Sequence, residues 1–260
     1  MPELPAAFLD RPIAHRALHD IAQGRPENSV EAIRAAIDAG YGIEIDLQPS
    51  SDGEAMVFHD YDLARLTVQD GPVCGHDAAA LGALPLRHGQ SGIPTLAEVL
   101  ALVDGRVPLL IEVKDQDGSM GPDVGALEAA AARALTGYQG PVALMSFNPH
   151  SVAALARLLP EIPRGLTTCD YRAEHYPGLP AATRDSLRGI SGFRPLRREL
   201  HQPQLARSRQ PAGGRAARRG RAGAVLDRAR PRGRDAGPPR GAQHHVRGIP
   251  GLNRGTCRPD

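Results

Sequence analysis

The residues most suited to chemistry are two closely spaced pairs of charged side chains. Glu44 and Asp46 form an E-x-D pair in "GIEIDLQ", and Glu112 and Lys114 form an E-x-K pair in "LLIEVK". Alternate residues of a strand point to the same side, so each pair would present its two side chains together. Either pair alone is more typical of the exposed face of a half-polar strand. That interpretation is weaker for "LLIEVK", because charged groups at the end of an apolar, buried strand need partners or a ligand.

Histidines and further cations could complete a site that cleaves a phosphodiester. Three carboxylates without a nearby cysteine favour a hard, oxygen-preferring cation such as Ca²⁺ or Mg²⁺. His15 and His59 suit general acid–base catalysis near neutral pH, although a single histidine is more often structural. Arg16 and Lys114 suit a phosphate, one as a planar fork and the other as a point charge. These groups together describe phosphodiester cleavage by a metal-dependent enzyme, and they leave its family open.

Strand and helix patterns alternate along the first 190 residues and would position these side chains. The predicted strands span residues 11–17, 42–48, 107–114, 141–147 and 162–170, with a turn and an extended segment at 51–60, and the predicted helices span 28–40, 95–105, 123–137 and 149–159. This alternation predicts a parallel sheet with crossover helices. In a (β/α)8 barrel, the carboxyl ends of the strands meet at one mouth, where the active site lies. We therefore expect the charged pairs and His15 to end their strands at one rim.

Two of these helices carry recognisable caps. Asn28 or Ser29 can cap the helix at 28–40, which Gly40 closes, and Thr95 can cap the helix at 95–105. The strand at 107–114 is almost continuously apolar, which is typical of a strand that is buried on both faces.

A longer series of motifs follows the same order along the chain. H-R, P-E-N-S, E-x-D, a D-G turn, H-D and R-x-T lie between residues 14 and 67, and "IPTLAEVL", "IEVK" and "SFN" continue the series to about residue 150. This series resembles the glycerophosphodiester phosphodiesterases, a family of (β/α)8 TIM-type barrels. One departure is Ala17, which stands where the family usually has glycine after H-R.

The resemblance implies a role for seven residues. It assigns a divalent cation to Glu44, Asp46 and Glu112, acid and base catalysis to His15 and His59, and the phosphate to Arg16 and Lys114. It further implies that the glycerol 2-hydroxyl attacks phosphorus and expels the other alcohol, and that water opens the resulting cyclic phosphate to glycerol 3-phosphate. Glu27 and Asn28 would shape the mouth of the site rather than act in catalysis.

The composition changes sharply near residue 192. Residues 1–190 hold 14 Lys and Arg against 25 Asp and Glu, whereas residues 191–260 hold 17 Arg, no Lys and 4 acidic residues. Gly and Pro supply 19 of those last 70 residues. Such a segment buries too little apolar surface to offset its chain entropy, which predicts a disordered extension rather than a nucleic-acid-binding arm.

The last third of the chain also lacks what the family resemblance requires. Three more barrel strands should follow, one with a Trp-Thr pair, yet the chain has no Trp. Back-translation with a one-base shift can turn residues 198–211 into "ASFISHNWRDLDNP", 222–229 into "PVLCWTVR" and 243–248 into "NITFEG". We therefore expect a frameshift near residue 193, with a barrel segment at 1–192, an out-of-frame tail at 193–260, and impaired activity because strands 6–8 are replaced.

Other features bear on location and on rival functions. The start of the chain has no basic and apolar leader, no apolar run could span a membrane, and three dispersed cysteines favour reduced thiols. These features predict a cytoplasmic protein. The family resemblance implies that its partner is a small-molecule glycerophosphodiester. One alternative is a non-catalytic polyanion or nucleic-acid binder that uses the basic tail. The other is a related phospholipase-D-like barrel phosphodiesterase acting on intact lipids.

Overall fold

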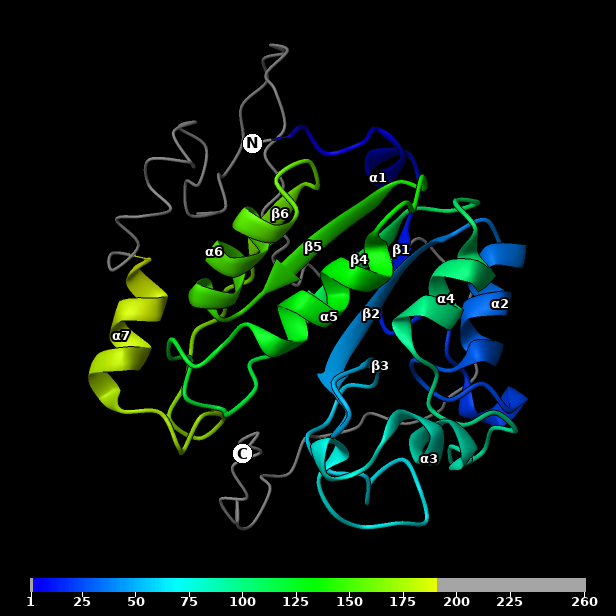
Figure 1. The fold of residues 1–260 in the computed structure, drawn as a ribbon, viewed down its shortest axis with the longest axis horizontal. Coiled ribbons are helices and arrows are strands. Elements are labelled where there is room, and N and C mark those ends of the chain that lie inside the picture. Colours follow the sequence, from blue (N-terminus) through cyan, green and yellow to red (C-terminus); the bar gives the residue numbers. More distant parts are fainter. Residues whose placement is uncertain (1, 191–260) are drawn as a thin grey trace, which may run out of the picture.

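The structure is a computed structural model that describes residues 2–190, and its centre is a six-stranded sheet (Figure 1). The strands are β1 (Ile13–Ala14), β2 (Gly42–Pro49), β3 (Ala55–Val57), β4 (Leu109–Val113), β5 (Val142–Ser146) and β6 (Arg164–Leu166). Five of them are parallel in the order β1-β2-β4-β5-β6, and β3 pairs antiparallel with β2.

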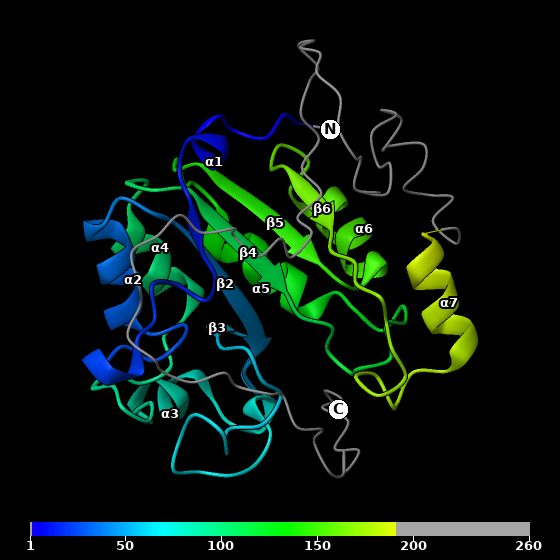
Figure 2. The same ribbon diagram turned by 180° about the vertical axis from the view of Figure 1, so that it is seen from behind.

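Helices connect the parallel strands and cover one face of the sheet. The α-helices are α1 (Ala7–Asp10), α2 (Val30–Asp38), α3 (Ala78–Ala83), α4 (Leu96–Val103), α5 (Ala126–Leu135), α6 (Pro149–Leu158) and α7 (Ala181–Gly189), with 3₁₀ turns η1 (Ile21–Gln23) and η2 (Val73–Gly75). Figures 1 and 2 show α2, α4, α5 and α6 along the same side of the sheet. Ser29 caps α2, and Thr95 forms a capping box with Glu98 at the start of α4.

The main core lies between these helices and the outer face of the sheet. Along β2, Ile43, Ile45 and Leu47 are completely buried and belong to this core. Because side chains alternate along a strand, Glu44 and Asp46 point to the opposite, inner face. The same apolar-outside, polar-inside alternation therefore positions the carboxylates.

The inner face is apolar toward the amino ends of the strands. Phe8 of α1 packs there against Leu110 of β4 and Ala143 of β5. Glu112 lies two residues beyond Leu110 and so points to the same face, nearer the carboxyl end of β4. Apolar packing thus fills one end of the inner face and leaves charged groups at the other.

The predicted α/β architecture with five parallel strands is confirmed, with differences in three strands. Glu44 and Asp46 do not end their strand, because pairing of Leu47 with Val57 continues β2 to Pro49. β1 and β6 are shorter than predicted; positive φ angles at Arg16 and Ala17 end the extended run after β1. The expectations for residues 193–260 lie outside the described residues.

Two further sequence expectations can be compared with residues 2–190. No helix in this range is long and apolar enough to cross a lipid bilayer. Cys169 has a free thiol, as expected.

Candidate active site

Three buried carboxylates meet on the inner face of the sheet. The register of the parallel pair β2–β4 sets Asp46 opposite Glu112, and Glu44 lies two residues before Asp46. Glu44, Asp46 and Glu112 are 3%, 1% and 6% exposed. One oxygen from each lies within 4.8 Å of the others, close enough for a shared cation. The structure thus brings together the three residues that the sequence predicted as metal ligands.

The local charge balance fits a divalent cation. Lys114 Nζ lies 2.7 Å from Asp46 Oδ1 and 2.5 Å from Glu112 Oε1, so one ammonium serves two carboxylates. Glu44 Oε1 is buried and has no hydrogen-bond partner among the described residues. Burial, followed by repulsion from Asp46, raises the pKa of Glu44 to about 8. A cation that prefers oxygen ligands would favour the ionised form of Glu44 and offset the negative charge of the cluster.

The segment after β1 brings His15 and Arg16 to the carboxylates. The backbone N–H of Arg16 donates to Glu44 Oε2 at 2.8 Å. Its guanidinium lies 2.9 Å from Glu27 Oε1 and 3.7 Å from Asp46 Oδ2. His15 Nε2 lies 3.9 Å from Glu44 Oε2, and its side chain is 57% exposed. The first candidate imidazole and the first candidate phosphate ligand therefore border the acidic cluster.

His59 approaches from the segment that follows β3. Its Nδ1 lies 2.7 Å from Asp60 Oδ1, and Gln48 of β2 donates to its backbone carbonyl at 3.2 Å. Burial tends to raise the pKa of Asp46, but Lys114 and then His59 outweigh that effect and lower it. His59 is thus electrostatically coupled to the same cluster as His15.

Neighbouring residues hold this arrangement. Asn28 donates from Nδ2 to Asp46 Oδ2 at 2.9 Å and accepts from the backbone N–H of Asp46 at 3.3 Å. Arg65 binds both Glu27 and Asp60. The roles of Arg65 and Asp60 were missed in the sequence, although both lie in the H-D and R-x-T motifs that carried the family resemblance.

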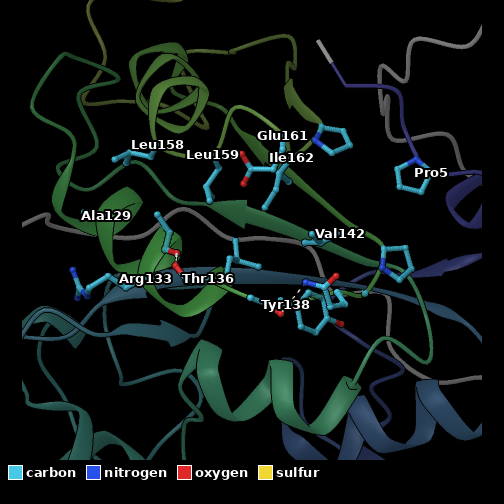
Figure 3. Close-up of a pocket in the computed structure, with 17 residues that line it drawn as sticks. Pro5, Ala129, Arg133, Thr136, Tyr138, Val142, Leu158, Leu159, Glu161 and Ile162 are labelled. Atoms are coloured by element: carbon cyan, nitrogen blue, oxygen red, sulfur yellow. Dashed lines mark hydrogen bonds between the residues drawn. The ribbon is translucent and has the colours of Figure 1, made fainter.

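A separate pocket lies at the opposite end of the sheet. It has a volume of about 830 Å³ and is lined by Pro141 and Val142 at the start of β5 and by Pro163 just before β6 (Figure 3). None of the seven candidate residues lines it. The large pocket and the candidate chemistry are therefore at different ends of the strands.

A family model for glycerophosphoryl diester phosphodiesterases matches residues 15–191, which is more than half of the chain. The chain belongs to this family. The matched range contains all seven candidate residues, from His15 to Lys114, and confirms the family and enzyme class expected from the sequence.

Two curated proteins are each similar to more than half of the chain. The uncharacterized protein YqiK of Bacillus subtilis is 34% identical over 175 residues, which cover 63% of this chain and 69% of YqiK. A glycerophosphodiester phosphodiesterase of Caldanaerobacter subterraneus is 29% identical over 164 residues, covering 59% of this chain and 65% of the relative.

Solved structures of glycerophosphodiester phosphodiesterases share the fold. A phosphodiesterase of Oleispira antarctica, in complex with its product sn-glycerol-3-phosphate, is 27% identical with a TM-score of 0.56. The match covers 71% of this chain and 74% of that protein. The structural relatives are TIM barrels, which agrees with the parallel sheet and connecting helices of residues 2–190.

Proposed function

We propose that this chain is a metal-dependent glycerophosphodiester phosphodiesterase that forms glycerol 3-phosphate and an alcohol. The observation that carries the proposal is the set of three buried carboxylates within 4.8 Å of one another, bordered by His15 and Arg16. Family membership and the glycerol 3-phosphate in the Oleispira antarctica relative support the substrate class.

The acidic cluster and the two cations would hold the phosphate. Glu44, Asp46 and Glu112 would bind a Ca²⁺ or Mg²⁺ ion, which when bound polarises phosphoryl oxygens. The planar guanidinium of Arg16 would bind phosphate oxygens. The backbone N–H of Arg16 donates to Glu44 and its guanidinium pairs with Glu27, and these two contacts fix Arg16 beside the acidic cluster. Lys114 would add a point charge beside Asp46 and Glu112.

The two imidazoles would move the protons of a two-step reaction. In the first step the glycerol 2-hydroxyl bonds to phosphorus and the ester bond to the other alcohol breaks. One imidazole takes the hydroxyl proton and the other gives a proton to the leaving alcohol. Water then opens the cyclic phosphate, with the imidazoles exchanging these roles. Placement of His15 and His59 on segments from two different strands supports this division of labour.

The first prediction tests the carboxylate cluster. Release of glycerol 3-phosphate from glycerophosphocholine should require Mg²⁺ or Ca²⁺ and should stop when EDTA is added. Glu44→Gln should lower kcat/KM by about 100-fold or more, because an uncharged amide binds the cation poorly. Exposed Glu54 provides the matched control Glu54→Gln, which should retain activity. Turnover that withstands both EDTA and Glu44→Gln would remove the proposal. Preference for intact phospholipid over glycerophosphocholine would favour the phospholipase-D-like alternative.

A further inference from the structure

Arg65 forms an unusually complete ion-pair contact next to the candidate site. Its Nε and Nη2 donate to the two oxygens of Asp60 at 2.5 and 2.9 Å. Its Nη1 and Nη2 donate to the two oxygens of Glu27 at 2.9 and 2.6 Å. All three guanidinium nitrogens are therefore used, and each carboxylate is held at both oxygens, which fixes its orientation as well as its position.

Each of these two carboxylates also contacts one candidate site residue. Asp60 Oδ1 lies 2.7 Å from His59 Nδ1, and Glu27 Oε1 accepts from Arg16 Nη1 at 2.9 Å. A continuous series of contacts thus connects His59 to Arg16 through Asp60, Arg65 and Glu27. It links the segment between β3 and η2 to the segment before α2.

The charged groups in this series of contacts determine which ring nitrogen of His59 carries no proton. Burial tends to raise the pKa values of Glu27 and Asp60, but hydrogen bonds, including those from Arg65, outweigh burial and lower both values. An ionised carboxylate only accepts hydrogen bonds, so the partner nitrogen, Nδ1 of His59, must carry a proton. In the neutral imidazole this leaves Nε2 as the nitrogen that can take a proton.

The solvent exposure of Arg65 argues against a purely stabilising role. The Arg65 side chain is 46% exposed, and ion pairs in water contribute little to folding stability. A fork that holds two carboxylates in fixed directions has its main effect on orientation. The two groups thereby oriented are one of the two acid–base imidazoles and the phosphate-binding guanidinium of the proposed reaction.

We propose that Arg65 is a positioning residue that orients His59 through Asp60 and Arg16 through Glu27. Its effect on turnover rests on the proposed function, whereas its effect on the tautomer of His59 does not. Arg65 thereby keeps the Nε2 of His59 available for proton transfer and holds the guanidinium of Arg16 beside the phosphate site. Loss of the Arg65 guanidinium changes the state of the His59 ring and the position of the Arg16 guanidinium together.

The deciding experiment measures the tautomer of His59 by ¹⁵N NMR of the full chain at a pH where imidazoles are neutral. The signals are assigned by their loss in His59→Asn. The original chain should show the Nδ1–H tautomer, and Arg65→Gln should shift His59 measurably toward Nε2–H. Arg65→Lys, which keeps the charge but not the fork, should lie between them and provides a second variant if Arg65→Gln does not fold.

A matched control is Arg172→Gln, because Arg172 forms a similar exposed pair with Asp170 at 2.5 Å. This variant should leave the His59 signals unchanged. An unchanged His59 tautomer in both Arg65 variants would overturn the proposal, even if the chain shows no turnover.

Kinetics separate the two branches of the fork. Asp60→Asn should lower mainly kcat and Glu27→Gln should raise mainly KM, each by about 10-fold, the usual size of effects from residues that orient others. Arg65→Gln should show both changes, and Arg65→Lys should partly restore them. An Arg65→Gln enzyme with unchanged kcat and KM would show that the fork does not serve the reaction.

Discussion

At the scale of single residues, Asn28 combines a backbone role with a contact to the acidic cluster. Its φ is +58°, a left-handed conformation that asparagine tolerates better than most residues. It is fully buried, and its amide both donates to the Asp46 carboxylate and accepts from the Asp46 backbone N–H. One side chain therefore fixes the position of a candidate metal ligand at two points.

Replacing Asn28 separates these two contributions. Asn28→Ala should lower the free energy of unfolding by about 2–3 kcal/mol, about 1 from the left-handed backbone and the rest from lost hydrogen bonds to a buried carboxylate. Asn28→Gly lacks the side chain but adopts the positive φ freely, so it should be more stable than Asn28→Ala. Urea denaturation of both variants measures this. Equal stability of Asn28→Ala and the original chain would show that neither contribution matters.

Residue types and spacing predicted the seven candidate residues but not the contacts between them. The E-x-D and E-x-K pairs identified four charged groups, whereas the position of Lys114 between Asp46 and Glu112 depends on strand register. Ala17, which stands where the family usually has glycine, adopts a backbone conformation that the sequence did not reveal. Its φ is +63°, the conformation that a glycine adopts without strain.

At the scale of elements, Glu31 connects the first turn of α2 to a distant loop. Its Oε1 accepts from the backbone N–H groups of Gln90 and Ser91 at 3.0 and 2.9 Å, and its Oε2 accepts from Ser91 Oγ at 2.6 Å. Burial opposes ionisation, but these hydrogen bonds outweigh it and lower the pKa of Glu31 to about 2. The carboxylate thus stabilises the packing of this loop on α2.

This contact should make stability depend on pH in acid. The folded-state pKa of Glu31 is about 2 and its ordinary value is 4.5, so its contribution is complete above pH 4.5 and is lost as pH falls toward 2. Because solvent screens this partly exposed group, we expect only about 1 kcal/mol. Denaturant titrations should therefore show the advantage of the original chain over Glu31→Gln shrinking between pH 6 and 3. An advantage that stays constant across this range would contradict the assignment.

The strength of the periodic pattern decided which elements could be predicted. α2, α4, α5 and α6 each bury at least three residues and were found near their true bounds. α7 buries only Leu187, and α3 has six residues with only Leu81 buried, so neither presents an apolar stripe. β3 was expected as an extended segment, but its antiparallel pairing depends on the turn that returns it to β2.

At the scale of the whole molecule, the parallel sheet of residues 2–190 ends at β1 on one side and at β6 on the other. The family match ends at residue 191, next to the abrupt change in composition, while the matched regions cover 69% and 65% of two curated relatives. We therefore propose that residues 1–192 are the in-frame part of a (β/α)8 barrel and that residues 193–260 are read out of frame. The five parallel strands of residues 2–190 would then lack the sixth, seventh and eighth parallel strands of a complete barrel.

Restoring the frame by one base near codon 193 tests this proposal. Three added strands would pair the edges of β1 and β6 that no other strand of residues 2–190 covers. Barrel closure would also cover the inner face on which the carboxylates lie. The restored chain should unfold at higher urea concentration, and its kcat/KM for glycerophosphocholine should exceed that of the original chain by about 100-fold or more, since small displacements of catalytic groups already cost that much. The matched control is the third reading frame from the same codon, which changes the residues after that codon without restoring the original frame. Equal turnover by the original and restored chains would show that residues 1–192 hold the site without the missing strands, and verified DNA with one intact frame through this region would remove the frameshift itself.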